Sequence, residues 1–375
     1  MVTGSPKDLR RLALATLAAF GCGHTDPFST PPYGTTQPFD PTPPIRLTFN
    51  AGADRSASWL TDGSGIVYSA QQLGRPDKDV CLAELPPGGG TQRQLVCDLS
   101  RLGSDTSNAF ESPAVAADGR LVFLKASGSI GGTNPSREGL SVAPTLDAAN
   151  AAEVQRVPYS VPGEPARSAV QALRWLAADR LVYVGSLAAL RQACLLCPLD
   201  TIRTGLKVDV LDFSQPGTLP APVPGTDYAS GVAVGASSDE LYLTLGGDTR
   251  VYRRVLSTGE TAVVHDFGAA GVARDVHVAG GRLAAIVGGR VAFAVDPALG
   301  PVQWDSGGVI HVVDLGSGDE VALDPGARLF RRPALSPAGD RLVAEGYSLI
   351  ITPGTSGLAD TTVSRASDLF LFTTP

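Results

Sequence analysis

The sequence is short of positive charge and of long apolar runs, and each shortage excludes a class of protein. Its 30 Lys and Arg residues are outnumbered by 37 Asp and Glu, so the 375-residue chain has a formal net charge of −7. A nucleic-acid-binding surface needs a basic field, and we therefore predict no nucleic-acid partner. No segment reaches the ~18 consecutive apolar residues of a membrane-spanning helix.

The motifs of several enzyme classes are also missing. The chain has no Gly-x-Ser-x-Gly nucleophile elbow, no Asp-x-Asp-x-Asp-Gly calcium loop and no Ser-x-Asp-x-Gly-x-x-Trp sialidase box. Histidine is scarce, and His24, His265, His277 and His311 lack metal-ligand spacing. We predict no metal site, no cofactor and no named catalytic residue. A glycosidase-type pair of carboxylates has no fixed spacing in a sequence, so that alternative stays open.

The first residues have the layout of an export signal. Lys7, Arg10 and Arg11 precede an apolar run over 12–20 that is too short to span a membrane. The sequence Ala19-Phe20-Gly21-Cys22 resembles the lipobox of bacterial lipoproteins, with Phe20 where a small residue is usual. This resemblance implies lipidation at Cys22. An ordinary signal peptide and a short buried helix are the alternatives.

Residues 23–44 are rich in Pro, Thr and Gly and have no apolar periodicity. Such a stretch forms an extended tether, which at ~3.1 Å per residue would reach up to ~70 Å. We therefore divide the chain into a signal peptide (1–22), a tether (23–44) and a folded domain (45–375).

The remaining cysteines are four, an even number that favours disulfides in an exported chain. Cys81 and Cys97 would staple a hairpin. Cys194 and Cys197 have the Cys-x-x-Cys spacing of a redox or metal pair, but no βαβ context and no second pair accompany them. For these two, a structural disulfide or inert thiols are the favoured interpretation.

From residue 45 onward one pattern repeats: a short apolar segment, a tight turn, and a strongly β-forming run. In the first copy Ser58–Thr61 leads through Asp62-Gly63 into Ile66-Val67-Tyr68. Such turns predict hairpins. They fall near residues 62, 118, 179, 239, 280 and 339. Their spacing of ~40 to 60 residues is that of a propeller blade, and a second hairpin after each copy makes four strands per unit.

The repeat predicts an all-β, six-bladed β-propeller of four-stranded antiparallel blades. The last copy runs out after Leu369–Phe372, without an outer strand. Residues 45–49 have the composition of the outer strands elsewhere. We therefore predict that this N-terminal segment completes the last blade and closes the ring, which removes open sheet edges.

The repeat carries a family resemblance. Ser58-Trp59 followed by Asp62-Gly63-Ser64-Gly65-Ile66-Val67-Tyr68, and Leu335–Leu342 in the last copy, resemble the TolB-like propeller repeat. The resemblance extends over about residues 45–375 and implies a propeller in the bacterial cell envelope. Family members of this kind work with a peptidoglycan-associated lipoprotein, but the chain has no recognisable N-terminal α/β domain. A repeat identifies a fold and not a ligand.

The predicted links between second and third strands are long, at about 126–138, 185–206, 294–308 and 346–367. Long loops on one face of a rigid scaffold are where binding usually resides. Charged residues that would reach the channel mouth on this face are Arg55, Glu111, Arg167, Asp227, Arg274, Asp275, Arg331 and Arg332. Their alternating sign could hold a peptide or a sugar, or could belong to a solvated rim. We expect Trp59 and Trp175 to be core residues.

Two functions follow from this organisation. The first is an exported, lipid-anchored and monomeric scaffold, facing the periplasm or the exterior, that binds an envelope protein, a peptide or a cell-wall glycan. The second is a polysaccharide lyase or glycosidase that uses the channel mouth. The second needs at least two carboxylates around a cavity, whereas paired charges would favour the scaffold.

Overall fold

Asp-Gly turns between β-forming runs produce antiparallel hairpins, and hairpins make up almost the whole structure. The computed structural model describes residues 44–49, 52–71, 80–97, 106–129, 137–148, 150–161, 163–164, 166–192, 199–288, 293–296, 300–303, 307–323, 328–353 and 359–375. All of them fall within the unit Pro41–Pro375. In this part of the chain the one helix is the 3-10 turn η1 (Gly268–Ala270). No described helix is long and apolar enough to cross a membrane.

The described strands form antiparallel blades of four strands, as the repeat predicted. Blade one is β2 (Asp54–Trp59), β3 (Ile66–Gln71), β4 (Val80–Leu85) and β5 (Arg93–Val96), and blade two is β6 (Thr106–Val115), β7 (Leu121–Ser129), β8 (Arg137–Ala143) and β9 (Ala152–Val157). Blade three is β10 (Ala169–Ala177), β11 (Arg180–Gln192), β12 (Leu199–Asp212) and β13 (Ala221–Pro222), and blade four is β14 (Ala229–Val234), β15 (Glu240–Leu245), β16 (Arg250–Val255) and β17 (Thr261–Asp266). Blade five is β18 (Ala273–Ala279), β19 (Arg282–Val287), β22 (Val309–Asp314) and β23 (Glu320–Leu323), and blade six is β24 (Arg328–Leu335), β25 (Arg341–Pro353), β26 (Ala359–Thr373) and β1 (Ile45–Arg46).

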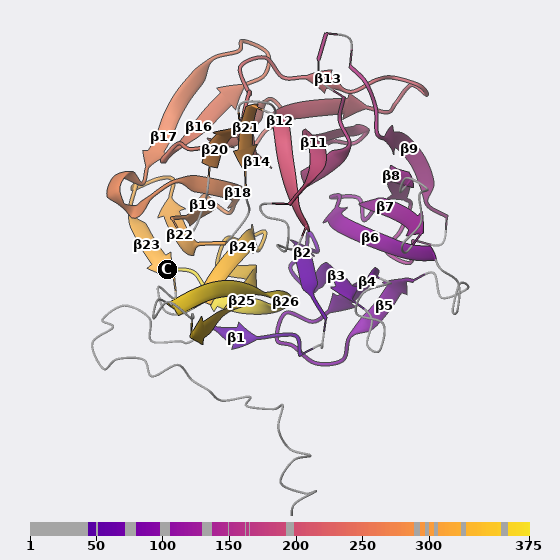
Figure 1. Cartoon of the computed structure of the whole chain (residues 1–375). Coiled ribbons are helices and arrows are strands. Elements are labelled where there is room, and N and C mark those ends of the chain that lie inside the picture. Colours follow the sequence, from indigo (N-terminus) through magenta and orange to yellow (C-terminus); the bar gives the residue numbers. More distant parts are fainter. Residues whose placement is uncertain are drawn as a thin grey trace, which may run out of the picture. The chain divides into compact units, whose positions relative to one another are not determined.

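The innermost strands close a ring. β2 contacts β6, and the contacts continue from β6 to β10, β14, β18 and β24 before returning from β24 to β2. The blades follow one another around this ring in chain order (Figure 1). The described part of the chain is therefore a β-propeller.

The predicted closing strand is confirmed. Ile45 and Arg46 of β1 pair with Leu371 and Phe370 of β26, at the edge of blade six. The ladder continues one residue further, where the Leu47 amide donates to the Leu369 carbonyl at 2.7 Å. The N-terminal end of the domain thus completes the last blade and covers its open edge.

The core is divided among the interfaces between neighbouring blades. The residues that the structure describes form six clusters of buried apolar side chains, one for each interface. Val67 of blade one packs with Phe123 of blade two in one cluster, while Tyr68 packs with Leu369 of blade six in another. A second strand is therefore buried on both faces, which explains why Ile66-Val67-Tyr68 is continuously apolar rather than alternating.

The predicted core tryptophans occupy equivalent positions. Trp59 is 6% exposed and donates its indole N–H to the Ala334 carbonyl of the preceding blade at 2.8 Å. Trp175 is partly buried and makes the same bond to Ala114 at 2.9 Å. An arginine from the turn of the preceding blade lies over each ring, Arg341 over Trp59 at 5.0 Å and Arg120 over Trp175 at 4.9 Å.

The long links were expected to be loops, but the strands of the blades run far into two of them. β11 and β12 remain paired from Leu187–Thr204 to Gln192–Leu199, so much of 185–206 is a strand hairpin. β25 and β26 likewise pair as far as Pro353 and Ala359. In both places cross-strand hydrogen bonding carries the two strands past the blade. The sequence does not reveal where such pairing ends when apolar residues stand in place of turn residues.

A third long link contains a separate hairpin of β20 (Phe293–Asp296) and β21 (Gly300–Gln303). Arg203 of β12 pairs with Gln303 of β21. The hairpins of blades three and five therefore meet and form one continuous sheet in the order β10-β11-β12-β21-β20. We call the side of the propeller that carries these links the hairpin face.

Cys81 and Cys97 form a disulfide, as predicted. Cys22, Cys194 and Cys197 lie outside the described residues, and so do the predicted signal peptide and all of the predicted tether except Pro44.

Candidate functional site

A bulge in the innermost strand of each blade shapes the centre of the propeller. The pairing of β2 with β3 shifts between Arg55 and Ser58, and equivalent shifts occur in the other inner strands. In five of these strands the bulge residue has a left-handed backbone with φ between 46° and 54°. These five residues are Ser56, Ser112, Ala172, Asp275 and Arg332. A bulge redirects the strand and the side chains next to it.

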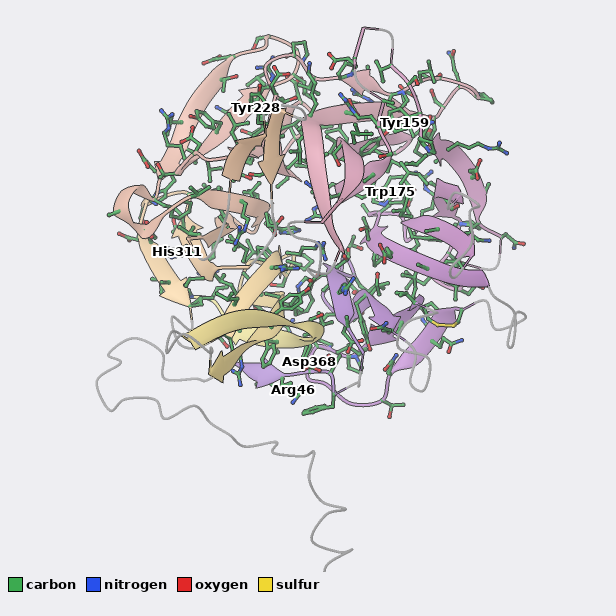
Figure 2. All side chains as sticks on the ribbon, viewed as in Figure 1. Arg46, Tyr159, Trp175, Tyr228, His311 and Asp368 are labelled. Carbon is green, nitrogen blue, oxygen red and sulfur yellow. A yellow bond between two sulfur atoms is a disulfide. The ribbon has the colours of Figure 1, made fainter. Side chains whose placement is uncertain are left out.

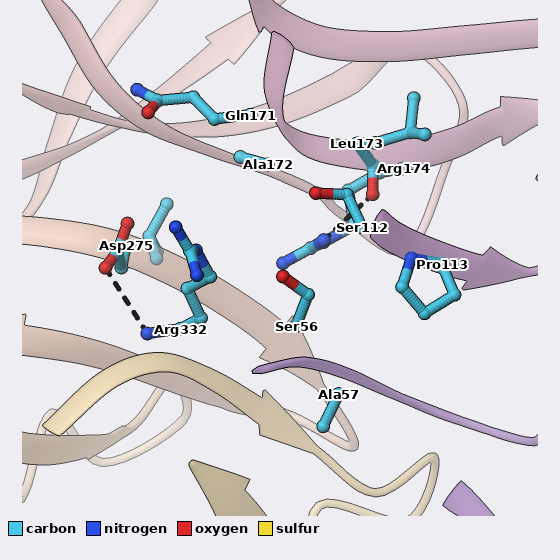
Figure 3. A pocket seen from close by; sticks show the side chains of 11 residues that line it. Ser56, Ala57, Ser112, Pro113, Gln171, Ala172, Leu173, Arg174, Asp275 and Arg332 are labelled. Carbon is cyan, nitrogen blue, oxygen red and sulfur yellow. Dashed lines mark hydrogen bonds between the residues drawn. The ribbon is translucent and has the colours of Figure 1, made fainter. Parts of the chain in front are cut away.

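These five bulges come together around one small cavity, which we call the channel cavity. Its lining includes all five bulge residues, together with Gln171 and Arg174 (Figure 3). The cavity volume is about 30 Å³. This is room for about two water molecules, whereas pockets for small-molecule ligands usually measure ~300 Å³ or more.

The carboxylates beside the channel cavity are held by specific partners. Glu345 is fully buried and accepts from Arg332 Nη1 at 2.9 Å and from the Ser56 amide at 2.5 Å. Its second oxygen accepts from the Tyr347 hydroxyl at 2.7 Å. Asp275 accepts from the backbone amide of Arg332 at 3.3 Å, the bond drawn in Figure 3. The charges at this point are paired.

Arg174 is the second cation, beside Arg332, that lines the channel cavity. Its Nη1 donates to the carbonyl of Leu173 at 2.8 Å, while its Nε is buried and has no hydrogen-bond partner among the described residues. Burial lowers the pKa of Arg174 to about 10; Asp275 opposes this shift and Arg332 adds to it. The guanidinium therefore carries its charge at neutral pH in a place where that charge is poorly compensated.

His277 lies two residues after the bulge residue Asp275. Its Nδ1 accepts the backbone amide of Leu335 at 3.2 Å, which joins blade five to blade six. Burial, with a smaller contribution from Arg174, lowers the pKa of His277 to about 3. The imidazole is neutral at physiological pH and acts as an acceptor between blades.

Of the eight charged residues singled out in the sequence, Asp275 and Arg332 line the channel cavity. Four others directly precede a bulge residue in an inner strand: Arg55, Glu111, Arg274 and Arg331. Arg274 is 1% exposed, and Arg331 lies over the ring of Tyr347 at 4.4 Å.

Arg167 belongs to a buried network near blade three instead. Its Nε donates to Asp209 at 3.1 Å, and the Tyr159 hydroxyl donates to the same oxygen at 2.7 Å. Arg167 and Asp209 are both fully buried. A buried ion pair of this kind is a structural element of the interface between blades two and three.

Asp227 lies at a different place on blade four. It lines an open hollow of about 540 Å³ together with Tyr228, Asp248, Arg250 and Asp266. Asp227 also pairs with Lys207 of β12 at 3.3 Å.

Ser56, Ser112, Gln171 and Arg174 line the channel cavity but were not singled out in the sequence. The five left-handed bulge residues include two Ser, one Ala, one Asp and one Arg, so residue type gives no signal for the bulge. The position of a residue would have given a signal, since each of the five bulge residues precedes the predicted hairpin turn by five to seven residues.

Comparison with known proteins agrees with the strand arrangement. No family model matches the chain, and no curated protein matches it in sequence. Among solved structures, TolB from Acinetobacter baumannii is 13% identical, with a TM-score of 0.52 over 83% of this chain. The fold is a TolB-like β-propeller. The chain spans 66% of the length of that TolB.

A gluconolactonase from Xanthomonas campestris, XC5397, is also similar to this chain, with a TM-score of 0.53. It is 16% identical, and the match covers 88% of this chain and 89% of that one. At these identities the likeness is one of fold alone. Among the described residues, no group of three or more His, Cys, Asp or Glu could hold a metal ion.

Proposed function

We propose that this protein is a binding scaffold of the bacterial cell envelope, which receives a carboxylate group of a protein or peptide partner at its channel cavity. The observation that carries the proposal is Arg174. Its buried Nε lacks a hydrogen-bond partner among the described residues, and burial lowers the pKa of its guanidinium, with a smaller contribution from Arg332. An incoming carboxylate would supply both the acceptor and the counter-charge.

The size of the channel cavity fits this ligand group. About 30 Å³ accommodates a carboxylate but not a sugar ring or a whole amino-acid residue. The hydroxyls of Ser56 and Ser112 and the amide of Gln171 line the same cavity and add donors. The rest of a partner would then lie over the hairpin face, where β12 and β21 form a joined platform.

An enzyme is the alternative, and the gluconolactonase likeness is the observation that favours it. A glycosidase or lyase mechanism needs acid and base groups that can reach a substrate. Glu345, however, is bonded to Arg332, Tyr347 and the Ser56 amide and is fully buried. At the channel cavity, this pairing supports the scaffold over the enzyme.

The proposal is tested by peptide display with the wild-type protein and with Arg174→Gln. We expect selected peptides to be enriched in Asp or Glu, and their binding to weaken at least about tenfold in the variant, the loss of one charge-assisted hydrogen bond. Arg93→Gln, on the exposed outer strand β5, is the matched control and should bind normally. Selection of the same peptides by Arg174→Gln would refute the carboxylate site.

A panel of polysaccharides and sugar lactones tests the enzymatic alternative. The scaffold proposal expects turnover at background. Turnover by the wild-type protein that Glu345→Gln abolishes would establish the enzyme in its place.

Export and lipid anchoring at Cys22 are part of the same proposal, on the strength of the lipobox-like sequence Ala19–Cys22. Intact-mass analysis of protein extracted from its native membrane, with Cys22→Ser beside it, tests them. We expect a mature chain that begins at Cys22 and carries acyl mass, and a soluble variant. A chain cleaved elsewhere and found free would refute the anchor.

A further inference from the structure

Blade four differs from its neighbours on the hairpin face. Blades three and five extend long hairpins from the link between second and third strands, whereas the link from β15 to β16 spans only residues 246–249. The short link leaves the open hollow of about 540 Å³ described above, which we call the blade-four hollow. This volume is within the usual range for small-molecule sites.

One residue that lines the blade-four hollow is Tyr228, whose backbone is held on both sides. The amide of Tyr228 donates to the Leu206 carbonyl at 2.8 Å, and its carbonyl accepts from the Gly246 amide at 2.7 Å. Tyr228, labelled in Figure 2, has a side chain that stays exposed, at 44% for the residue. An exposed aromatic ring offers a flat apolar surface with a hydroxyl at its edge.

Other residues that line the hollow carry fixed polar groups. Arg250 donates from Nε and Nη2 to the two oxygens of Asp248, both at 2.9 Å. Asp266 accepts from the Thr249 hydroxyl at 2.6 Å and from the Gly268 amide at 2.9 Å through one oxygen. The hydrogen bond from Arg250 is the main cause that lowers the pKa of Asp248 to about 2, and the Thr249 hydroxyl lowers that of Asp266. Both carboxylates are therefore ionised at neutral pH. Asp248 is already occupied by Arg250 and by the Tyr252 hydroxyl, which donates to it at 2.6 Å, so Asp266 is the acceptor for a ligand.

Gly246 and Gly247 also line the hollow, with backbone alone. The turn they form is closed by a bond from the Asp248 amide to the Leu245 carbonyl at 3.1 Å, and Gly247 has φ 81°. A side-chain-free floor lets a ligand approach the main chain closely.

A ligand for this hollow needs an apolar face for the ring and a hydroxyl group for the Asp266 carboxylate. We propose that the blade-four hollow binds a neutral sugar residue, whose C–H face packs on Tyr228 and one of whose hydroxyls donates to Asp266. The three aspartates that line the hollow outnumber the two nearby cations, Arg250 and Lys207, so the region has a net negative charge. This charge disfavours the binding of uronates and phosphates. This site goes beyond the proposed function, because it is separate from the channel cavity.

Saturation-transfer NMR and calorimetry on the whole protein test the proposal, with cellotriose, N-acetylglucosamine trimer and trigalacturonate as probes. We expect at least one of the two neutral trisaccharides to bind, with transfer to its ring C–H protons, and trigalacturonate to bind at least about tenfold more weakly. Tyr228→Ala should weaken binding at least about tenfold, while Tyr228→Phe keeps the ring and most of the affinity. Asp266→Asn should also weaken it.

Phe49→Ala is the matched control, since Phe49 is a 63% exposed aromatic ring outside the hollow. It should bind sugar as the wild type does. No binding of either neutral probe, or equal binding by Tyr228→Ala in a folded protein, would overturn the proposal. Arg174→Gln should leave sugar binding unchanged, and Tyr228→Ala should leave peptide binding unchanged. The proposal for the channel cavity and the proposal for the blade-four hollow are therefore tested independently.

Discussion

Trp59 of the first blade donates its indole N–H to the carbonyl of Ala334 in the last blade, over 2.8 Å and across 275 positions of the chain. This bond joins the first and last blades at their innermost strands, whereas the outer strand β1 joins the two ends of the propeller at the rim. Trp59→Phe leaves the buried Ala334 carbonyl without its donor, and we expect it to cost about 1–3 kcal/mol of the free energy of unfolding. Denaturant titration measures the loss.

Trp175→Phe removes the same bond between blades two and three, but Trp175 is only partly buried. Its cost should be smaller, because water can replace part of the lost bond. Equal stability of wild type and Trp59→Phe would contradict the closing role of this bond.

Closure by the N-terminal strand makes a second prediction. Leu47 is 6% exposed in the cluster between blades one and six, so Leu47→Ala should lower the unfolding free energy by about 3 kcal/mol. Ile45, two residues earlier, is 51% exposed, and Ile45→Ala should have little effect. Similar losses from the two variants would argue that this segment does not complete blade six.

The buried pair of Arg167 and Asp209 requires a glycine at position 185. A Cβ at Gly185 would lie 2.9 Å from Arg167 Cδ and 3.0 Å from the Tyr159 hydroxyl oxygen, and would collide with Asp209 Oδ2. Gly185→Ala should therefore destabilise the protein by about 3 kcal/mol. Gly88→Ala, where a Cβ has nothing within 4 Å, is the control in a calorimetric melt.

The neutral imidazole of His277 predicts acid sensitivity. Its pKa falls from an ordinary value near 6.5 to about 3 on folding, so between these values the unfolded chain binds a proton that the folded chain does not. This contribution to stability is complete above pH ~6.5 and is lost as the pH falls toward ~3. His277→Asn keeps a polar group but does not titrate, so denaturation at pH 7, 5 and 4 should reveal a shallower decline. Parallel declines would contradict the assignment.

The left-handed backbone of the bulge residues predicts an unusual response to glycine. Ala172 has φ 52°, a conformation that costs alanine but not glycine, so Ala172→Gly should stabilise the protein by about 0.5–1 kcal/mol. Ala177→Gly, at the end of the same strand, should destabilise it by a similar amount. A loss of stability in Ala172→Gly would indicate that the bulge is absent.

The sequence was sufficient to predict the fold because each local signal agrees with the global one. The turn at Asp62-Gly63, the buried run Ile66-Val67-Tyr68 and the closing strand at Ile45 are all consequences of hairpin chemistry and burial. Cys81 and Cys97 were close enough in the sequence for their disulfide to be proposed.

The site was predicted less well, for a physical reason. Whether Arg167 faces a mouth or a buried partner depends on Asp209, which is distant in the sequence and comes close only in the fold. The bulge that brings Arg174 to the centre is set by backbone register, and residues as different as Ser56 and Arg332 occupy it. Long links such as 185–206 continue as strands through pairing that composition does not specify.

Site-specific photo-crosslinking from the hairpin face tests the central claim most directly. A benzophenone amino acid at Leu187, which is 36% exposed where β11 extends onto the hairpin face, is compared in native membranes with one at Val263, which is 51% exposed on the outer strand of blade four. We expect Leu187 to yield one partner, crosslinked beside an Asp- or Glu-containing segment, and Arg174→Gln to abolish the adduct, while Val263 yields none. The same adducts from both positions, or an adduct that survives Arg174→Gln, would contradict the account.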